Sequence, residues 1–489
     1  MKSDKQLVMH GLVWKYLERS AAQAVQFVVT LLLARLLLPE DFGALSLVTV
    51  FLNIALVFVQ SGFGTALVQK ESVTEEEFNS VFYFSLTLGA LLAGLFFFLA
   101  PLISDFFAYP VLKNVLRVLA LSLPLAGMNN VLQARVIRRM QFKKLFAASV
   151  TGSLFSAAVS LFMAFRGFGI WALVVQQLMF QIVSFLVLSA VEHWRAGRSV
   201  SFASIRGVLS FGSKLLLSNL IDCIYTNLYT LVIGKCFSSE AVGYYDKGRQ
   251  FPGFVITNVN AAVQSVMFPA LARKQSDVPA VKGMVRRLIA VSTFIIFPCM
   301  AGLFVAAEPL IRLLLTEKWL PAVPFLRAYC LIYALWPVFT ANLQAINALG
   351  RSDIFLILEI IKKGVGVLIL LFTLPMGLKA MIAGSCVSAF LGIFINSFPN
   401  RKLLGYRTGE LFRDLAPAAA MSAAMGAAAY FAGCLVRHDL MKLLVEAACG
   451  VFVYILLAKL FHAESYRYIL MSVRQFRTSS GTADQNAEE

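Results

Sequence analysis

Residues 79–104 read NSVFYFSLTLGALLAGLFFFLAPLIS, without a single Asp, Glu, Lys or Arg. An α-helix needs about 20 predominantly apolar residues to cross about 30 Å of hydrocarbon, and this run is long enough to do so. Membrane-spanning β-strands would instead show short segments of alternating hydrophobicity. The run therefore predicts a transmembrane helix.

Similar apolar runs recur on both sides of this one. The chain is 59% hydrophobic and only 14% charged, whereas soluble domains carry about a quarter charged residues. We therefore expect an all-α membrane protein with about fourteen transmembrane helices. The predicted spans lie at 12–34, 42–66, 79–104, 112–134, 145–165, 168–191, 208–233, 250–271, 288–307, 323–347, 354–376, 378–399, 415–435 and 441–461.

Basic residues predict the orientation of these helices. With the N-terminus inside, roughly two thirds of the 43 Lys and Arg residues fall in cytoplasmic segments, as the positive-inside rule requires. One cytoplasmic loop alone holds Arg135, Arg138, Arg139, Lys143 and Lys144. Both termini are therefore predicted to be cytoplasmic. The net charge of +17 follows from this bias, so no nucleic-acid partner is expected.

The two halves of the chain resemble each other. Four residues, Leu31, Arg35, Glu40 and Gly43, recur in order as Leu231, Lys235, Glu240 and Gly243. Pro101-Leu102-Ile103 likewise matches Pro309-Leu310-Ile311. Because each half contains six spans, the halves have the same orientation and are expected to be related by a pseudo-twofold axis along the membrane normal. Arg35, Glu40 and Gly43 are interpreted as residues that shape an outer turn.

This repeat predicts four segments. An N-terminal lobe of six spans covers 1–206, and a second lobe of six spans covers 207–400. The last two spans, at 401–465, lie outside the repeat. A cytoplasmic tail at 466–489 follows, and its distal, polar part is predicted to be disordered. The substrate path is expected at the interface between the two lobes.

The stretch LLARLLLPEDFG at 32–43 resembles the early signature of Wzx-type polysaccharide transporters, which belong to the multidrug/oligosaccharidyl-lipid/polysaccharide exporter superfamily. Gly62-Phe63-Gly64, Ala66 to Lys70 and the span count continue the resemblance, which covers essentially the whole chain and is strongest to the colanic-acid-exporter-like branch. It implies a bacterial inner-membrane flippase for undecaprenyl-diphosphate-linked oligosaccharides. Membrane lipid, a polymerase and a chain-length regulator are the candidate partners.

Polar residues inside the predicted spans are the candidate site residues, because an uncompensated charge in hydrocarbon is costly. They occur in both halves, as a lumen between two lobes requires. The candidates for substrate binding are Lys15, Arg19, Gln26, Gln60, Lys214, Arg249, Gln264, Lys362 and Lys363. The candidates for ion coupling are Asp222 and Glu359. Cations would compensate the diphosphate, and amides would bind sugar hydroxyls.

Structural roles stand beside these functional ones. Gln60 and Gln264 could serve only as hydrogen bonds between helices, and Glu359 with Lys363 has the spacing of an ordinary helical ion pair. Lys15 and Arg19 could act only as topology determinants. Transport could draw on an ion gradient at Asp222 or Glu359, or on the gradient of the substrate itself.

Three alternatives remain: a flippase for another lipid-linked substrate, a cation-coupled drug antiporter of the same superfamily, and a membrane polysaccharide polymerase. A cation-coupled drug antiporter would share the fold, but its cavity should be acidic or apolar, whereas the candidate residues include more cations than carboxylates. A membrane polysaccharide polymerase would need a long outer loop with catalytic groups, and no predicted outer loop is long enough. The seven cysteines and four histidines show no metal-binding spacing. No catalytic residue, metal or cofactor is therefore expected.

Overall fold

The computed structural model of the chain is entirely helical in the part it describes, which comprises residues 4–60, 64, 67–68, 70–197, 199–274, 277–462, 465–467 and 471. Within these ranges, side chains are described except at 4–13, 15–16, 19, 202–215, 258–270 and 272. The helices form two compact units, residues 1–246 and 247–489, and the boundary between the units falls inside one helix, α10.

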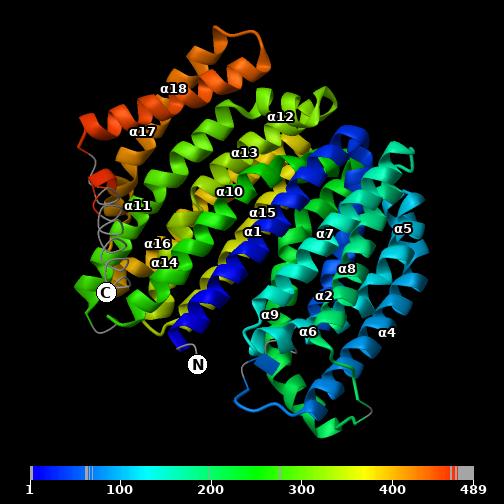
Figure 1. Ribbon diagram of the computed structural model, residues 1–489. Helices are drawn as coiled ribbons and strands as arrows, with labels where there is room; N and C mark the ends of the chain where they lie inside the picture. Colours follow the sequence, from blue (N-terminus) through cyan, green and yellow to red (C-terminus); the bar gives the residue numbers. More distant parts are fainter. Residues whose placement is uncertain are drawn as a thin grey trace, which may run out of the picture. The chain divides into compact units, whose positions relative to one another are not determined.

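Unit 1 contains the helices at the start of the chain (Figure 1). They are α1 (Asp4–Leu36), α2 (Pro39–Gln60), α4 (Glu75–Phe107), α5 (Val111–Ala120), α6 (Ser122–Arg138), α7 (Phe142–Phe165), α8 (Ile170–Glu192), α9 (Phe202–Cys236) and the start of α10 (Ser239–Ala272). Helix α7 packs against α1 and α8, and α9 packs against α2 and α4. The sequence assigns α9 to the second lobe, and the predicted division into two six-helix lobes stays a prediction.

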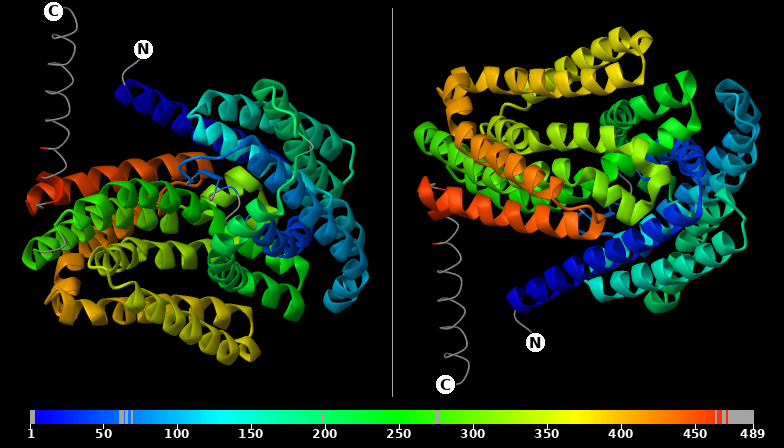
Figure 2. Two further views of the ribbon diagram at one scale, coloured as in Figure 1. Left: turned by 90° about the horizontal axis from the view of Figure 1, so that it is seen from below. Right: turned by 90° about the horizontal axis from the view of Figure 1, so that it is seen from above.

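Unit 2 contains the rest of α10 and the helices that follow it. They are α11 (Val278–Val305), α12 (Ala307–Leu315), the 3₁₀ turn η1 (Glu317–Ala322), α13 (Val323–Ala334), α14 (Trp336–Ala348), α15 (Ser352–Thr373), the 3₁₀ turn η2 (Leu374–Met376), α16 (Leu378–Leu403), α17 (Thr408–Cys434) and α18 (Asp439–Leu460). Helix α17 packs against both α11 and α18, and the two views in Figure 2 show α17 and α18 side by side.

Eleven helical segments of the described chain are long and apolar enough to cross a membrane. The other three of the fourteen predicted spans coincide with α1, α10 and α15. Helix α1 contributes a shorter apolar segment at Ser20–Leu36, and much of α10 has no described side chains. Helix α15 carries Glu359, Lys362 and Lys363 in its middle. The prediction of a multi-pass helical membrane protein is confirmed, and the count of fourteen stays a prediction.

Two of the predicted spans are broken in the middle. The span at 112–134 divides into α5 and α6 around Leu121, three residues before Pro124. The span at 323–347 divides into α13 and α14 around Leu335, two residues before Pro337. Proline removes a backbone donor and crowds the preceding turn, which explains a break on its N-terminal side. Both broken spans are fourth in their half, as an internal repeat predicts.

Large apolar side chains cover much of the surface of both units. Phe98 on α4 is 78% exposed, and Phe372 on α15 is 75% exposed. Water-soluble proteins rarely expose extensive apolar patches, whereas lipid-facing helices do so throughout. Inside unit 2, Val281, Val285 and Ile289 repeat every four residues along α11 and are fully buried in the core of the unit. This spacing places them on one helical face.

A buried carboxylate joins several basic residues at the predicted cytoplasmic end of unit 1. The Glu192 side chain at the end of α8 is 0% exposed. It lies 2.8 Å from Arg139 Nη1, 2.7 Å from Lys144 Nζ and 3.2 Å from Arg135 Nε. Arg135 also pairs with Glu75 at the start of α4, at 2.7 Å. The basic loop that sets the predicted topology is therefore tied to α4, α6 and α8.

The repeated glycines lie at a close crossing of two helices. A Cβ on Gly43 would lie 1.6 Å from the carbonyl oxygen of Ser239, and one on Gly243 would lie 2.1 Å from that of Pro39. The starts of α2 and α10 can therefore approach this closely only because both residues lack a side chain.

Nearby, burial and then a hydrogen bond to Glu40 raise the pKa of Tyr109 to about 12, which keeps the phenol protonated.

Replacement of Gly43 by alanine should destabilise unit 1 by about 1–3 kcal/mol, because the new methyl group would meet backbone atoms that no rotamer change can move. The matched control is Gly94→Ala on α4, where a Cβ meets nothing within 4 Å. That change should be neutral, or should stabilise the helix by about 1 kcal/mol. Unfolding of the purified variants in a denaturing-detergent titration measures both effects. Equal stability of the two variants would contradict the close crossing.

Candidate functional site

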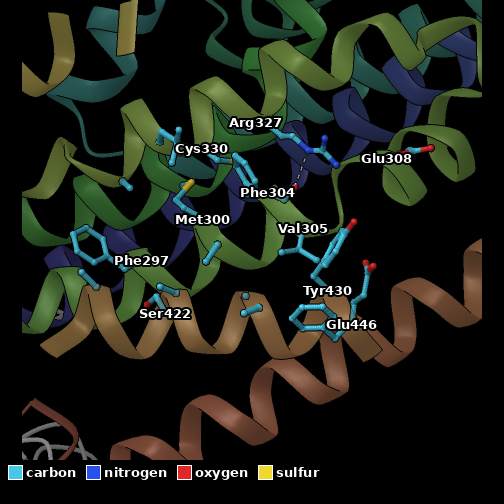
Figure 3. A pocket seen from close by; sticks show the side chains of 18 of the residues that line it. Phe297, Met300, Phe304, Val305, Glu308, Arg327, Cys330, Ser422, Tyr430 and Glu446 are labelled. Carbon is cyan, nitrogen blue, oxygen red and sulfur yellow. Dashed lines mark hydrogen bonds between the residues drawn. The ribbon is translucent and has the colours of Figure 1, made fainter. Parts of the chain in front are cut away.

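A cavity of unit 2 lies between α11, α12, α13, α17 and α18 (Figure 3). Its volume is about 970 Å³. Most of its wall is apolar: Phe297, Met300 and Phe304 on α11 face Leu331 and Ala334 on α13 and the small residues of α17. Such apolar concave sites are typical of ligand-binding pockets.

The composition of α17 explains why there is room here. Residues 416–434 read APAAAMSAAMGAAAYFAGC, which is mostly Ala and Gly. Ala419, Ala423, Gly426 and Ala427 line the cavity at spacings of three and four residues, so they form one helical face with almost no side-chain volume. The larger Met421 and Met425 are buried in a core with α11 and α18. One face of α17 thus packs in the core, and the face with the small residues lines the cavity.

Charged groups gather at one end of this cavity, near the end of α11 and the start of α18. They are Glu308 on α12, Arg327 on α13, and Lys442 and Glu446 on α18. Arg327 Nε donates to the carbonyl oxygen of Phe304 at 3.3 Å, and its guanidinium lies 5.6 Å from the Phe304 ring. The charge bias along the chain assigns this end to the outer side of the membrane. The cavity therefore combines an apolar body with one charged end.

A smaller cavity is lined by residues of α11, α12, α17 and α18. Its volume is about 390 Å³, and its wall includes Pro298, Leu303, Met425 and Tyr454. Glu446 lines both this cavity and the larger one. The side chain of Glu446 thus lies in the partition between two apolar spaces.

A polar network closes the opposite, predicted cytoplasmic end of unit 2. Arg286 on α11 makes a two-pronged contact with Asp414 on α17, at 2.8 Å and 2.6 Å. Tyr406 donates to the same carboxylate at 2.8 Å, and burial and this hydrogen bond raise the pKa of Tyr406. Lys282 pairs with Glu410 at 2.8 Å. These contacts bind the start of α11 to the start of α17.

The described candidate residues from the sequence lie elsewhere. In unit 1, Gln26 on α1, Gln60 at the end of α2 and Asp222 on α9 are exposed. In unit 2, Arg249 on α10 is half-buried. Asp222 and Arg249 both have interaction partners. None of these four side chains lines the cavity between α11 and α18.

Helix α15 carries the remaining described candidates. Glu359 forms an ion pair with Lys362, three residues further on, and both side chains are half-buried. The sequence favours Lys363, four residues on, as the partner of Glu359; Lys363 is half-buried and has an interaction of its own. The four other candidates, Lys15, Arg19, Lys214 and Gln264, have side chains outside the described residues. The roles predicted for all eleven residues stay predictions.

None of the four charged residues of the cavity was among the candidates from the sequence, and Arg327 and Glu446 illustrate why. Arg327 belongs to the outer cations in the topology prediction, at the edge of a span, and so carries no site signal there. Glu446 lies inside the span at 441–461 and has Lys442 four residues before it, so it has the spacing of an ordinary helical pair. The sequence feature that could have identified Glu446 is the presence of a carboxylate inside a predicted span.

Comparisons with known proteins agree with this architecture. Residues 32–324 match the family model described as polysaccharide biosynthesis protein. The teichuronic acid biosynthesis protein TuaB of Bacillus subtilis is 24% identical over 94% of this chain and 96% of its own length. The succinoglycan biosynthesis transport protein ExoT of Rhizobium meliloti is 25% identical over 71% and 70%. The lipopolysaccharide biosynthesis protein WzxC of Escherichia coli is 24% identical over 72% of each chain.

Solved structures share the fold. The inward closed conformation of the lipid II flippase MurJ has a TM-score of 0.74, with 15% identity, over 94% of this chain and all of that one. An inward-facing multidrug resistance MATE family transporter of the MOP superfamily has a TM-score of 0.58, with 17% identity, over 79% and 98%. At these identities the likeness concerns the fold alone.

The chain has the multi-pass helical fold of these solved structures, and its sequence relatives place it in a family of transporters rather than enzymes. Since the family model covers more than half of the sequence, the chain belongs to the polysaccharide biosynthesis protein family. It is a bacterial membrane protein of polysaccharide biosynthesis, with Wzx-like relatives. The resemblance stated from residues 32–43 is confirmed.

Proposed function

We propose that this protein flips a polyprenyl-diphosphate-linked oligosaccharide repeat unit from the cytoplasmic to the outer leaflet of the bacterial inner membrane, with both termini in the cytoplasm. The observation that carries the proposal is the mostly apolar cavity of about 970 Å³ beside α17, with charges gathered at one end. This volume fits a segment of an isoprenoid chain and is too small for a whole lipid-linked oligosaccharide. The cavity would therefore hold part of the tail.

The head group needs a different path from the tail. A diphosphate and a glycan cannot cross hydrocarbon without a wet, polar route, because each uncompensated charge or unpaired polar group costs free energy. The cations and amides predicted in the spans of both halves would line that route, and alternate exposure of the two lobes would move the head across. The relatives named for teichuronic acid, succinoglycan and lipopolysaccharide support a lipid-linked glycan as substrate.

The test is transport by the purified protein in proteoliposomes that contain a fluorescent polyprenyl-diphosphate oligosaccharide. Protection of the fluorophore from a membrane-impermeant quencher reports flipping. We expect the protein to accelerate flipping relative to protein-free vesicles, and a short-chain analogue of the lipid to flip more slowly. A protein that moves a cationic drug but not this lipid would instead support the antiporter alternative.

Asp222 provides a separate test of ion coupling in unit 1. If its charge couples transport to an ion, Asp222→Asn should fold normally and transport without responding to an imposed pH or sodium gradient. The amide keeps the shape of the side chain and removes the charge. In a coupled transporter, the ion should then no longer shift the balance between the inward-open and outward-open states. An unchanged gradient response would contradict the coupling role. Failure to accumulate in the membrane would favour a structural role for Asp222, since loss of a charge leaves its partner uncompensated.

A further inference from the structure

Glu446 is an acidic residue inside a membrane-spanning helix, and its side chain has no hydrogen-bond partner among the residues that the structure describes. It is 4% exposed, and both carboxylate oxygens are buried without a partner. The carboxylate packs against α17, where a Cβ on Gly433 would lie 2.3 Å from Glu446 Oε1. An ionised carboxylate buried without compensation costs many kcal/mol, and such groups become neutral instead. The position of this side chain therefore demands a proton or another cation.

The described charged groups around Glu446, on α18 itself and on neighbouring helices, do not form an ion pair with its carboxylate. Lys442 on the same helix, Arg327 on α13 and Glu308 on α12 line the same cavity, and none forms an ion pair with Glu446 among the described residues. Arg327 is directed to the carbonyl oxygen of Phe304. Glu308 and Asp439 both contact Arg312 instead, at 3.2 Å and 3.8 Å. Glu446 and Tyr430 both line this end of the cavity (Figure 3).

The remaining ionisable neighbours of Glu446 are phenols and thiols. They are Tyr430 and Cys434 on α17, Cys330 on α13, and Cys299 and Tyr454, which line the smaller cavity. Phenols and thiols hold their protons at neutral pH in the absence of an activating cation. None of these groups supplies a positive charge to Glu446, which is the carboxyl group that lines both cavities.

We propose that Glu446 is a proton-binding site, neutral while it lies against Gly433 and ionised when it turns toward Lys442 and the charged end of the cavity. The spacing of four residues between Lys442 and Glu446 allows an ion pair on the exposed side of α18. The proton leaves the Glu446 carboxyl group for water at that end, and the carboxylate gains the Lys442 ammonium as its partner. The site thus has two arrangements that differ by one proton.

A proton fits this site better than a metal ion does. Hard cations such as Ca²⁺ require six to eight oxygen ligands. No group of three or more His, Cys, Asp or Glu side chains gathers anywhere in the described part of the chain. The residues of the smaller cavity around Glu446 include Met425, Ala429 and Gly450, which offer no side-chain oxygen. A proton needs only the one carboxylate oxygen that is present.

The direct test is labelling of the purified full-length protein with dicyclohexylcarbodiimide, which reacts with protonated carboxyl groups in apolar surroundings. Peptide mass spectrometry should find the adduct on Glu446 at neutral pH, in a yield that falls as the pH is raised. The internal control is Glu359, which is half-buried but paired with Lys362. We expect at least about tenfold less adduct on Glu359, because Lys362 already holds that carboxylate in an ion pair. Recovery of an unlabelled Glu446 peptide would overturn the proposal.

Stability provides a second readout that needs no reagent. A carboxyl group that is protonated when folded and ionised when unfolded makes the folded protein bind more protons, so its stability falls as the pH rises. Glu446→Gln mimics the neutral form and should fold like the wild type, with a weaker fall of stability toward alkaline pH. Gly433→Ala should displace the carboxylate and lower the labelling yield. An unchanged pH dependence in Glu446→Gln would contradict a proton at this site.

The consequence for transport rests on the proposed function, whereas the labelling does not. In proteoliposomes, Glu446→Gln should flip lipid-linked oligosaccharide at a rate that no longer depends on the pH at the charged end of the cavity. Labelled Glu446 in a protein that flips no such lipid would count against the proposed substrate and leave the proton site intact. If the wild type flips the lipid but Glu446 is not labelled, the proton site is wrong and the proposed substrate stands.

Discussion

Replacement of Glu192 by glutamine is expected to destabilise unit 1 by about 3 kcal/mol, the largest loss of stability that we predict for one side chain. The buried carboxylate of Glu192 contacts Arg135, Arg139 and Lys144 within 3.2 Å. Glutamine keeps the size of the side chain and removes the charge that these three cations share. The loss should lie at the low end of the range for broken buried pairs, because Arg139 and Lys144 retain contact with water.

Glu76→Gln is the matched control for this prediction. Glu76 lies in the first turn of α4, is exposed, and has no ion pair among the described contacts. Its replacement should change the stability by less than about 0.5 kcal/mol. The two variants should therefore differ clearly in stability when they are unfolded in a denaturing-detergent titration. A Glu192→Gln variant as stable as Glu76→Gln would mean that Arg135, with its second partner Glu75, does not need Glu192.

Hydrophobic patterning was sufficient to predict the class of fold. Each predicted span coincides with helix in the described chain, because a run of apolar residues long enough to cross the bilayer can satisfy its backbone only as a helix. The breaks within the spans at 112–134 and 323–347 were not predicted. They arise at Pro124 and Pro337, inside runs whose hydrophobicity gives no hint of an interruption.

The cavity could not have been predicted in the same way. Its space arises from the absence of side-chain volume on α17, at Ala419, Ala423, Gly426 and Ala427. Small residues are equally typical of tightly packed helix pairs in membranes, so their presence alone does not distinguish a cavity from a close contact. Only the position of α11 and α13 opposite this face makes the difference, and local sequence contains no information about that position.

The polar residues predicted as site candidates do not include the charged residues of this cavity, for a related reason. The candidates are mostly clusters of cations and amides, whereas Glu446 is a single carboxylate in the middle of an apolar helix. Glu446 is unusual because it forms no ion pair among the described residues, whereas ionisable residues in membranes generally pair with one another. The two spans outside the internal repeat, α17 and α18, supply this carboxylate and one wall of the cavity. In unit 2, the segments added to the repeat therefore carry the features most readily tied to a lipid substrate.

Replacement of Ala423 by tryptophan is expected to lower the rate of lipid-linked oligosaccharide flipping about tenfold. Ala423 is exposed and lines the cavity on α17, so an indole there would enter the cavity without displacing core residues. If it displaces two methylene groups of an isoprenoid chain, at about 0.8 kcal/mol each, the lost binding free energy is about 1.6 kcal/mol. A tenfold change corresponds to about 1.4 kcal/mol. The quencher-protection assay in proteoliposomes measures the rate.

The next residue on the same helix provides the control. Ala424 is also exposed but lines neither cavity of the α17–α18 pair. Ala424→Trp therefore adds the same side chain at the same depth on a different face of α17, and it should flip lipid at close to the wild-type rate. Both variants should reach the membrane in equal amounts, because neither alters the buried contacts of Met421 and Met425. If Ala423→Trp flips lipid as fast as Ala424→Trp, the cavity does not hold the tail, since a filled cavity would leave the tail no room there.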